Sequence, residues 1–456
     1  MLFPTFTFIL GFLPLTVIVY FLLAAKYRQL AQIWLIAASF VFYSWFNWSY
    51  AFILAFSILA NWSFAQWLIK KPSRMILTIG IIINVLLLGY FKYYDFFVTN
   101  LNAVFGTSVL LKNILLPLGI SFFTFQQISF LQLVYSRQLA MRYTFTEYAL
   151  FVCFFPQLIA GPIVLPDEMM SQFALPENSK FNYDNFARGL YTFALGLGKK
   201  ILLADFFAEI ADSGFAAGGG TFAESWQTAL AYTFQIYFDF SGYCDMAVGI
   251  GCMFNIILPE NFHAPYRADN ISDFWRRWHI TLGRFLMSSI YIPLGGNRCG
   301  KIRTCCNLLL TFFISGLWHG ASWLFVLWGL LHGAALVLHR IWSKFLNLRM
   351  PVIPARLLTF FFVLIAWVLF RAENLQQAQA LYRGMFAPEA WGRFDLSPRN
   401  TVLFAAALLL VLAGVPAYEL SRKFKPTYLN AVIAITLLVV SMFFFVKVSP
   451  FIYFNF

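Results

Sequence analysis

The chain has 456 residues, of which 61% are hydrophobic, 20% aromatic and only 11% charged. A soluble domain has about a quarter of its residues charged, so this composition excludes a soluble globular protein and indicates a polytopic membrane protein. The net charge of +13 does not require nucleic acid as a partner, because basic cytoplasmic loops that meet anionic membrane lipid explain it.

Apolar runs long enough to form membrane helices recur along the whole chain. They lie near residues 5–25, 30–47, 50–69, 75–97, 114–135, 146–165, 186–210, 226–256, 307–339, 357–371, 401–419 and 431–449. We therefore expect an all-α polytopic fold with about eleven or twelve membrane segments, broken or re-entrant helices among them. The first run is expected to remain uncleaved, because no basic residue precedes Lys26.

Short basic clusters orient the ends of the chain. They lie at residues 26–28, 70–74 and 422–425, and the positive-inside rule assigns them to the cytoplasm. This assignment predicts that the N-terminus and the C-terminal residues 451–456 lie outside. We expect the C-terminal aromatic side chains to be exposed and to contribute to the docking of a partner.

The segment 264–303 is both basic and aromatic, unlike the apolar runs around it. Asn270 or Ser272 is a suitable cap for a helix that continues to about Leu286. At 100° per residue this helix has one apolar face, with His279 at its edge. We therefore predict a single amphipathic helix lying on, or dipping into, the cytoplasmic side of the membrane.

The apolar run 307–339 carries His319 near its centre. A straight helix of this length would measure roughly 50 Å, whereas the hydrocarbon core is about 30 Å thick. Two complete spans with a turn would need more residues, so we predict a helix broken near Gly316 and Gly320. Because ionisable groups at membrane depth are costly, His319 is predicted to be the centre of a functional site. Trp318 is a candidate for orienting it or lining a tunnel.

His319 and His279 are the leading catalytic candidates. A neutral imidazole can remove a proton from an alcohol or thiol near physiological pH, as a general base must. The alternative is that each is a structural histidine, hydrogen-bonded inside the bundle, and the sequence leaves both open. We interpret His263, His332 and His339 as structural.

The run 234–246 places four polar side chains among aromatic ones: Asp239, Ser241, Tyr243 and Asp245. Carboxylates in a membrane segment need partners. Either each aspartate pairs with an arginine or a backbone donor, or these four residues orient a catalytic histidine or line a polar tunnel.

The string YIPLGGNR at residues 291–298 predicts a tight loop, because its paired glycines allow close backbone approach. The basic residues that end and follow it are candidates for holding donor phosphates: Arg298, Lys301 and Arg303. The same pattern also describes an ordinary cytoplasmic turn, and the sequence does not decide between the two.

Other site chemistry has no signature in this chain. The six cysteines have no CxxC or Cys/His spacing, so neither a zinc site nor a disulfide framework is indicated. The sequence also lacks the P-loop lysine, GxSxG and GxGxxG motifs. We expect no metal and no bound cofactor.

Several long strings resemble the membrane-bound O-acyltransferase superfamily, and within it the branch of the alginate O-acetylation membrane protein and its cellulose-acetylation relatives. They are LPLGISFFTFQQIS (116–129), FPQLIAGPI (155–163), FQIYFDFSGYCDMAVG (234–249), DFWRRWHITL (273–282), YIPLGGNR (291–298), GLWHGASWLFVLWGLLHG (316–333) and PFIYFNF (450–456). They recur in the family's order over residues 110–456.

The resemblance implies one membrane domain over residues 1–456, with funnels on the cytoplasmic and periplasmic faces that meet near the buried histidine. It divides the chain into N-terminal spans at 1–100, a catalytic core at 110–345 and C-terminal spans at 346–456. His319 matches the family's nearly universal catalytic histidine, and His279 matches its second, more variable position.

The resemblance further implies an O-acetyltransferase of the bacterial inner membrane. Cytoplasmic acetyl-CoA is the implied donor, and an exopolysaccharide of the alginate or cellulose type is the implied acceptor. The implied partners are a periplasmic acetyltransferase of the same pathway, the polysaccharide synthesis machinery and membrane lipid. One alternative is acyl transfer from a carrier-protein thioester, as in D-alanylation of cell-wall polymers. A second is a transporter with an intramembrane histidine, although no inverted repeat supports it.

Overall fold

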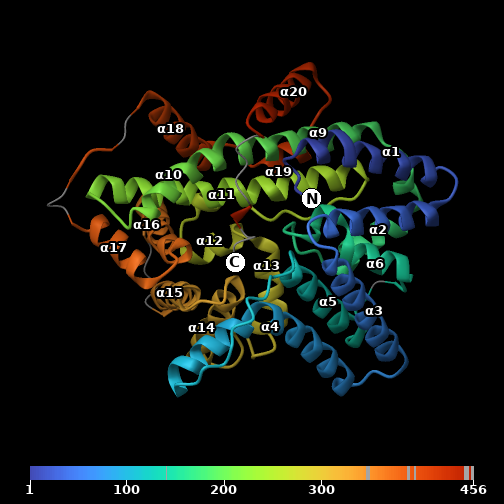
Figure 1. Ribbon diagram of the computed structural model, residues 1–456, viewed down its shortest axis with the longest axis horizontal. Helices are drawn as coiled ribbons and strands as arrows, with labels where there is room; N and C mark the ends of the chain where they lie inside the picture. The colour runs from blue at the N-terminus through green and yellow to red at the C-terminus, as the bar shows by residue number, and fades with distance from the viewer. Residues whose placement is uncertain (140, 346–349, 388–390, 395–396, 446–450, 453–456) are drawn as a thin grey trace. The chain divides into compact units, whose positions relative to one another are not determined.

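The computed structural model describes residues 1–139, 141–345, 350–387, 391–394, 397–445 and 451–452, with the side chains of Lys344 and Phe345 left out. Within these ranges the regular structure is helical and contains no β-strand, which confirms the predicted fold class (Figure 1). The chain folds into two compact units. The first unit comprises residues 1–194, 244–259 and 424–436, and the second comprises 195–243, 260–423 and 437–456.

The first unit is built mainly from the N-terminal helices. They are η1 (Thr7–Phe12), α1 (Leu13–Ala24), α2 (Arg28–Ser44), α3 (Ser49–Lys70), α4 (Arg74–Phe105), α5 (Ile120–Tyr135), α6 (Phe145–Cys153), α7 (Phe155–Leu158), α8 (Pro166–Ala174), η2 (Pro176–Ser179) and most of α9 (Tyr183–Gly198). α4 ends at Gly106, whose φ of +64° suits a glycine cap. α8 begins with Pro166, in a first-turn position that needs no N–H donor.

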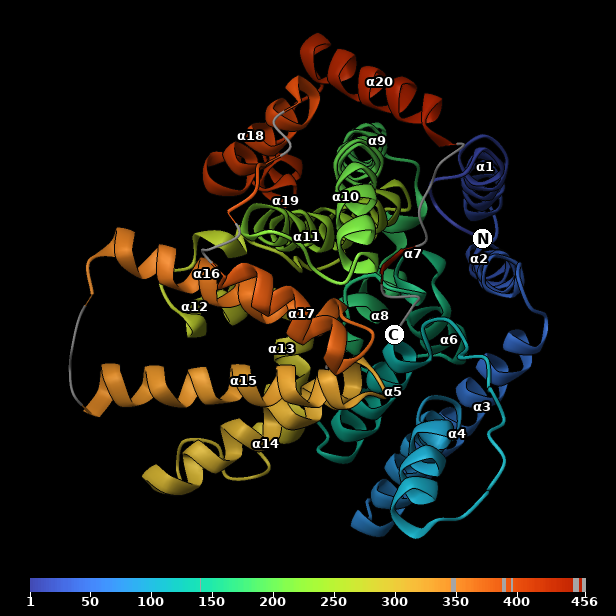
Figure 2. The ribbon, with the colours of Figure 1, turned by 60° about the vertical axis from the view of Figure 1, so that its left-hand side comes forward.

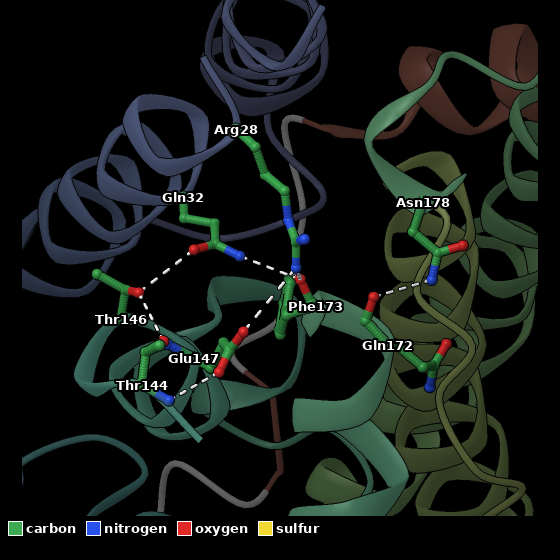
Figure 3. A network of polar contacts seen from close by, with 8 residues as sticks. All are labelled: Arg28, Gln32, Thr144, Thr146, Glu147, Gln172, Phe173 and Asn178. Atoms are coloured by element: carbon green, nitrogen blue, oxygen red, sulfur yellow. Dashed lines mark hydrogen bonds and ion pairs between the residues drawn. The ribbon is translucent and has the colours of Figure 1, made fainter. Parts of the chain in front are cut away.

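A polar network joins three helices of the first unit (Figure 3). Arg28 and Gln32 of α2 both donate to the backbone carbonyl of Phe173 near the end of α8, with Gln32 Nε2 at 3.1 Å. Glu147 caps the first turn of α6 by accepting from the Thr144 N–H at 2.8 Å, and its other oxygen lies 3.9 Å from Arg28. This network fixes the ends of α2, α6 and α8 against one another.

The second unit holds the other helices and all five histidines. Its elements are η3 (Lys199–Ala204), α10 (Asp205–Ala216), most of α11 (Phe222–Met253), η4 (Pro265–Arg267), α12 (Ile271–Arg277), α13 (Ile280–Leu286), η5 (Met287–Tyr291), α14 (Lys301–His319), α15 (Trp323–Arg340), η6 (Ile341–Phe345), α16 (Val352–Arg371), α17 (Leu375–Met385), α18 (Pro398–Ala413) and α19 (Ala417–Arg422). α20 (Tyr428–Phe443) belongs partly to each unit.

Five helical stretches within the described residues are long and apolar enough to cross a membrane. They are Thr7–Ala24, Ser49–Lys70, Arg74–Phe105, Trp323–Ser343 and Val352–Arg371, and Pro398–Ala413 and Tyr428–Phe443 are shorter apolar helices. The chain is therefore a multi-pass membrane protein. The total of about eleven or twelve membrane segments stays a prediction, as does the division near residues 100 and 345.

The predicted break in the run 307–339 is confirmed, and it separates two helices, of which α15 alone is long and apolar enough to be a candidate span within the described residues. α14 starts six residues before the run, at Lys301, and α15 continues to Arg340, so the two helices have 19 and 18 residues. The apolar run is shorter than the two helices together, because both helices carry basic residues at their outer ends. Figures 1 and 2 show the two helices side by side.

Glycines bring α14 and α15 close together. A Cβ atom on Gly316 would lie 2.3 Å from the carbonyl oxygen of Phe325 and 3.1 Å from the Cα atom of Gly329. Only a residue without a side chain permits this backbone approach, which is the usual device at helix crossings in membranes. The tight crossing holds the last turn of α14, which carries His319, against α15.

The single amphipathic helix predicted up to Leu286 is also wrong. Asn270 caps α12 as expected, its Oδ1 accepting from the Asp273 N–H at 2.9 Å. The helix then stops at Arg277, and α13 starts at Ile280. Two residues, Trp278 and His279, lie between the helices, and His279 has a φ of +46°, a left-handed conformation that neither helix can include.

Candidate active site

His319 is the last residue of α14 and is buried, with 3% of its surface exposed. The chain then runs through Gly320 in extended conformation, and Ser322 caps α15 by accepting from the Leu324 N–H at 3.3 Å. A Cβ atom on Gly320 would lie 2.2 Å from the ring of Phe325. The break therefore needs glycine at this point, directly after the candidate catalytic histidine.

Three aromatic rings enclose the imidazole of His319. Ring centroids lie 4.7 Å away for Trp318, 5.0 Å for Trp328 and 5.1 Å for Phe370. Trp328 comes from α15 and Phe370 from α16, and both are fully or almost fully buried. An imidazole in such surroundings is shielded from bulk water, as a site that transfers an acyl group to an alcohol requires.

His279 is buried as deeply, with 1% of its surface exposed, and a polar contact fixes its ring. Its Nδ1 lies 3.1 Å from Oδ1 of Asn261, which also accepts from the backbone N–H of Thr281 at 3.2 Å and from its hydroxyl at 2.9 Å. Because this oxygen is an acceptor, Nδ1 carries the proton and Nε2 carries the lone pair. The ring is therefore held in the tautomer that presents Nε2 as a base.

His279 lies outside the five candidate spans, and burial lowers its pKa to about 3. Desolvation disfavours the charged imidazolium, so the ring is neutral near pH 7. The left-handed backbone at this residue is one of the strained conformations that occur preferentially at functional sites. Asn261, which sequence reasoning missed, has no local motif that would reveal its role, since it lies 18 positions from His279.

The structure brings both candidate histidines into one aromatic cluster of the second unit. The ring of Trp318 lies 4.7 Å from the ring of His319 and 6.1 Å from that of His279. Phe240 of α11 packs edge-on against His279 at 4.8 Å. The sequence predicted the two histidines separately, and the tertiary structure places Trp318 beside both. Their catalytic roles stay predictions.

Asp239 has 2% of its surface exposed and is fully paired. Its Oδ1 lies 2.8 Å from Nζ of Lys200, and its Oδ2 accepts from the backbone N–H of Ile452 at 2.7 Å. Lys200 also contacts Asp205 at 2.8 Å. The interpretation that this aspartate pairs with an arginine or a backbone donor is borne out by the N–H of Ile452, and the cation beside it is a lysine.

The other polar residues of the run 234–246 divide between the units. Ser241 and Tyr243 belong to the second unit, and the ring of Tyr243 stacks on Phe451 at 4.6 Å. Asp245 belongs to the first unit and has 8% of its surface exposed. Whether these residues orient a histidine or line a tunnel stays a prediction.

The expectation of exposed aromatic residues at 451–456 is wrong where the structure describes them. Phe451 has 3% and Ile452 has 5% of its surface exposed. Phe451 packs against Phe240 and Tyr243, and Ile452 donates to Asp239. Positions 453–456 lie outside the described residues. The described part of this segment, Phe451 and Ile452, is therefore buried against α11 and does not form a docking surface.

The predicted phosphate-binding residues lie at the start of α14, and all three are exposed: Arg298, Lys301 and Arg303. Arg340, at the end of α15, joins them by donating to Oδ1 of Asn297 at 3.0 Å. This basic cluster lies at the opposite end of α14 from His319, about 27 Å away at 1.5 Å per residue. A donor held here needs a long, flexible arm to reach the histidine.

Comparison with known proteins identifies a family and several relatives. Residues 104–376, more than half of the chain, match the model of the membrane-bound O-acyltransferase family. The peptidoglycan O-acetyltransferase of Helicobacter pylori is 47% identical over 420 residues, which are 84% of this chain and 80% of the relative. The probable alginate O-acetylase AlgI of Azotobacter vinelandii is 39% identical over 440 residues, which are 92% and 85% of the two chains.

A more distant similarity extends to a different acyl transfer. The teichoic acid D-alanyltransferase of Bacillus subtilis is 25% identical over 283 residues, which are 57% of this chain and 70% of the relative.

Proposed function

Because the chain belongs to the membrane-bound O-acyltransferase family and is an acyltransferase, we propose that it takes acetyl groups from cytoplasmic acetyl-CoA. It passes them across the bacterial inner membrane for O-acetylation of a polysaccharide. The observation that carries this proposal is the position of His319. It is a buried imidazole at a helix break, enclosed by Trp318, Trp328 and Phe370, with the neutral His279 in the same aromatic cluster.

In the proposed reaction the acceptor hydroxyl oxygen attacks the carbonyl carbon of the thioester, and the carbon–sulfur bond breaks. His319 removes the hydroxyl proton as a general base and returns it to the departing sulfur, which yields an ester and free coenzyme A. His279, oriented by Asn261, presents Nε2 as a second acceptor of a proton or hydrogen bond. Positioning and exclusion of water supply most of the acceleration, because a thioester is already an activated donor.

A transient acetyl group on His319 is the other route for the same chemistry. In that case a ring nitrogen attacks the thioester carbonyl, the carbon–sulfur bond breaks, and coenzyme A leaves as the thiol with the proton of the ring. The acceptor hydroxyl oxygen then attacks the acetyl carbon, the carbon–nitrogen bond breaks, and the hydroxyl proton returns to the ring. The two routes differ in whether label from the donor is found on the protein.

We place the donor phosphates at the basic end of α14, on Arg298, Lys301 and Arg303. The pantetheine arm of coenzyme A is the long, flexible connection that the separation from His319 demands. No bound cofactor takes part in this scheme, because acetyl-CoA is a substrate.

The comparisons support a cell-surface glycan as the acceptor. The identity of 47% to a peptidoglycan O-acetyltransferase is higher than the 39% to a probable alginate O-acetylase. Peptidoglycan is therefore the first polymer to test, ahead of exopolysaccharides of the alginate or cellulose type. A periplasmic acetyltransferase and the polysaccharide synthesis machinery are the proposed partners, and membrane lipid surrounds the spans.

D-alanyl transfer from a carrier-protein thioester is the second candidate. The 25% identity to a teichoic acid D-alanyltransferase supports a shared fold and site but ranks this donor below acetyl-CoA. The transporter interpretation loses its basis, because the chain belongs to an acyltransferase family.

The test uses purified wild-type protein and His319→Ala in detergent with acetyl-labelled acetyl-CoA. Release of free coenzyme A by the wild type, lost in the variant while the variant keeps the wild-type unfolding temperature, is the expected result. Label on the wild-type protein would favour the acetyl-histidine route. Turnover by a correctly folded His319→Ala protein would contradict the site. Acetyl transfer that needs a carrier-protein thioester would contradict the donor.

A further inference from the structure

His332 lies on α15 in the second unit, and none of its surface is exposed. Its Nδ1 accepts a hydrogen bond from the indole Nε1–H of Trp275 at 3.2 Å. Because an indole nitrogen can only donate, Nδ1 must present its lone pair, which places the proton of the neutral ring on Nε2. The ring is therefore held in one tautomer, the reverse of that of His279.

This hydrogen bond joins two helices that carry different parts of the active site. Trp275 belongs to α12, which stops two residues before His279, whereas His332 belongs to α15, whose Trp328 packs against His319. Trp328 lies between the histidines, with ring centroids 5.0 Å from His319 and 4.8 Å from His332. His332 therefore supports one of the rings that enclose His319.

A second line of aromatic contacts returns to His279. Trp278, its immediate neighbour, packs on Trp367 at 5.0 Å, and Trp367 stacks on Trp328 at 5.8 Å with an interplanar angle of 18°. The backbone N–H of Trp278 donates to the Phe274 carbonyl at 2.8 Å, which ties the break to the end of α12. Any shift of α12 relative to α15 must therefore move His279 relative to Trp328, one of the rings that enclose His319.

Stacked rings alone would fix the position of α12 along α15 weakly, because aromatic surfaces can slide over one another. A hydrogen bond between two buried groups is directional, and breaking it leaves a polar atom without compensation in apolar surroundings. That penalty selects one register of α12 on α15. The ring of His332 lies among those of Phe274, Trp328 and Phe362.

We propose that His332 is a positioning residue for the acyl transfer. Through its bond to Trp275 it sets the register of α12 against α15, and so the placement of His279 beside the Trp318–His319 pair. This proposal rests on the proposed function for its kinetic consequences, whereas the coupling between Trp275 and His332 does not depend on the reaction. It replaces the interpretation of His332 as a structural histidine without a catalytic consequence.

The test compares three changes. His332→Asn keeps an acceptor close to the position of Nδ1, His332→Leu removes it at similar size, and Trp275→Phe removes the donor while keeping a ring. Trp226→Phe is the matched control, because Trp226 Nε1 also donates one hydrogen bond, to the Met385 carbonyl at 2.8 Å, away from both catalytic candidates.

We expect His332→Leu and Trp275→Phe each to lower kcat by roughly 10- to 100-fold, since displacements of about 1 Å have effects of this size. The KM for acetyl-CoA should change little, because the donor phosphates bind at the far end of α14. The Leu/Phe double variant should be no slower than either single variant, and His332→Asn should recover most of the lost rate. Trp226→Phe should keep the wild-type kcat.

Three results would each overturn the proposal. The losses of kcat could multiply in the double variant, His332→Asn could be as slow as His332→Leu, or Trp226→Phe could lose as much kcat as the other variants. Unfolding temperatures of the same proteins provide a second readout, in which the Trp275–His332 coupling must again be non-additive. If the wild type itself does not turn over acetyl-CoA, the proposed function has failed, and the unfolding temperatures still decide whether the coupling exists.

Discussion

Oδ1 of Asn261 lies 3.1 Å from Nδ1 of His279 and holds the imidazole in one tautomer. Two further hydrogen bonds, both from Thr281, fix the amide oxygen itself. The histidine has left-handed backbone torsions and lies in an aromatic cluster with Trp318. Backbone, side chain and surroundings together therefore determine the direction of a single ring, which is what a general acid–base group requires.

The Asn261→Asp change should introduce an acid limb into the pH dependence of activity. In the wild type burial lowers the pKa of His279 to about 3, so the ring is neutral over the working range. A carboxylate at the position of Oδ1 favours the imidazolium and raises this pKa. As the pH falls through the raised pKa, the ring becomes charged and loses its base function, so the optimum shifts upwards.

The measurement is kcat/KM for acetyl-CoA from about pH 5 to about pH 9, the range in which histidines titrate. Thr281→Val is the control, because it removes the hydroxyl that donates to Asn261 without adding a charge. A profile for Asn261→Asp that matches the wild type would show that His279 takes no part in proton transfer.

Lys200→Met should destabilise the protein more than Asp239→Asn. The ammonium group of Lys200 lies 2.8 Å from both Asp239 and Asp205, so its removal leaves two carboxylates without their cation, one of them deeply buried. Breaking a buried ion pair costs about 3–5 kcal/mol. Asp239→Asn leaves Lys200 paired with Asp205 and keeps an acceptor for the N–H of Ile452.

Unfolding temperatures in detergent measure this difference. Lys423→Met is a suitable control, since its pair with Glu419 is exposed and exposed ion pairs contribute little to stability. Equal destabilisation by the two buried substitutions would mean that Asp205 does not share the lysine.

Gly316→Ala should separate α14 from α15 and reduce activity. The added methyl group would lie 2.3 Å from the Phe325 carbonyl oxygen, a backbone atom that cannot move aside independently. Because His319 ends the same helix one turn later, we expect a loss of roughly 100-fold in kcat together with a lower unfolding temperature.

Gly89→Ala in α4 is the matched control, because a Cβ atom there meets nothing within 4 Å. It should keep full activity and gain about 1 kcal/mol of stability from the higher helix propensity of alanine. An active, stable Gly316→Ala protein would show that the close crossing is not needed.

Replacing Arg298, Lys301 and Arg303 together by glutamine should raise the KM for acetyl-CoA and leave kcat nearly unchanged. Their side chains are exposed at the start of α14, far from His319. Hydrogen bonds to charged groups are worth about 1.5–3 kcal/mol each, so the rise should be tenfold or more.

The difference in KM between the triple variant and the wild type should be smaller at high salt, which screens charge attraction. Lys70→Gln with Lys71→Gln removes basic charge from another predicted cytoplasmic cluster and serves as the control. A fall in kcat at unchanged KM would assign the three residues to another role.

Local sequence predicted most of the apolar helices and the helix break after His319, but not α8 and α17, which lie in polar stretches. The apolar runs correspond to helices, and the cap at Asn270 and the break at Gly320 occur where local signals predict them, because periodicity, caps and breakers are properties of neighbouring residues.

Contacts between residues distant in the chain needed the folded structure. Asn261 orients His279 across 18 positions, Asp239 accepts from Ile452 across 213, and Trp275 donates to His332 across 57. The left-handed turn at His279, which divides a predicted single helix, has no local sequence signal. It is maintained by such contacts, since packing and buried hydrogen bonds outweigh the preference of any one segment.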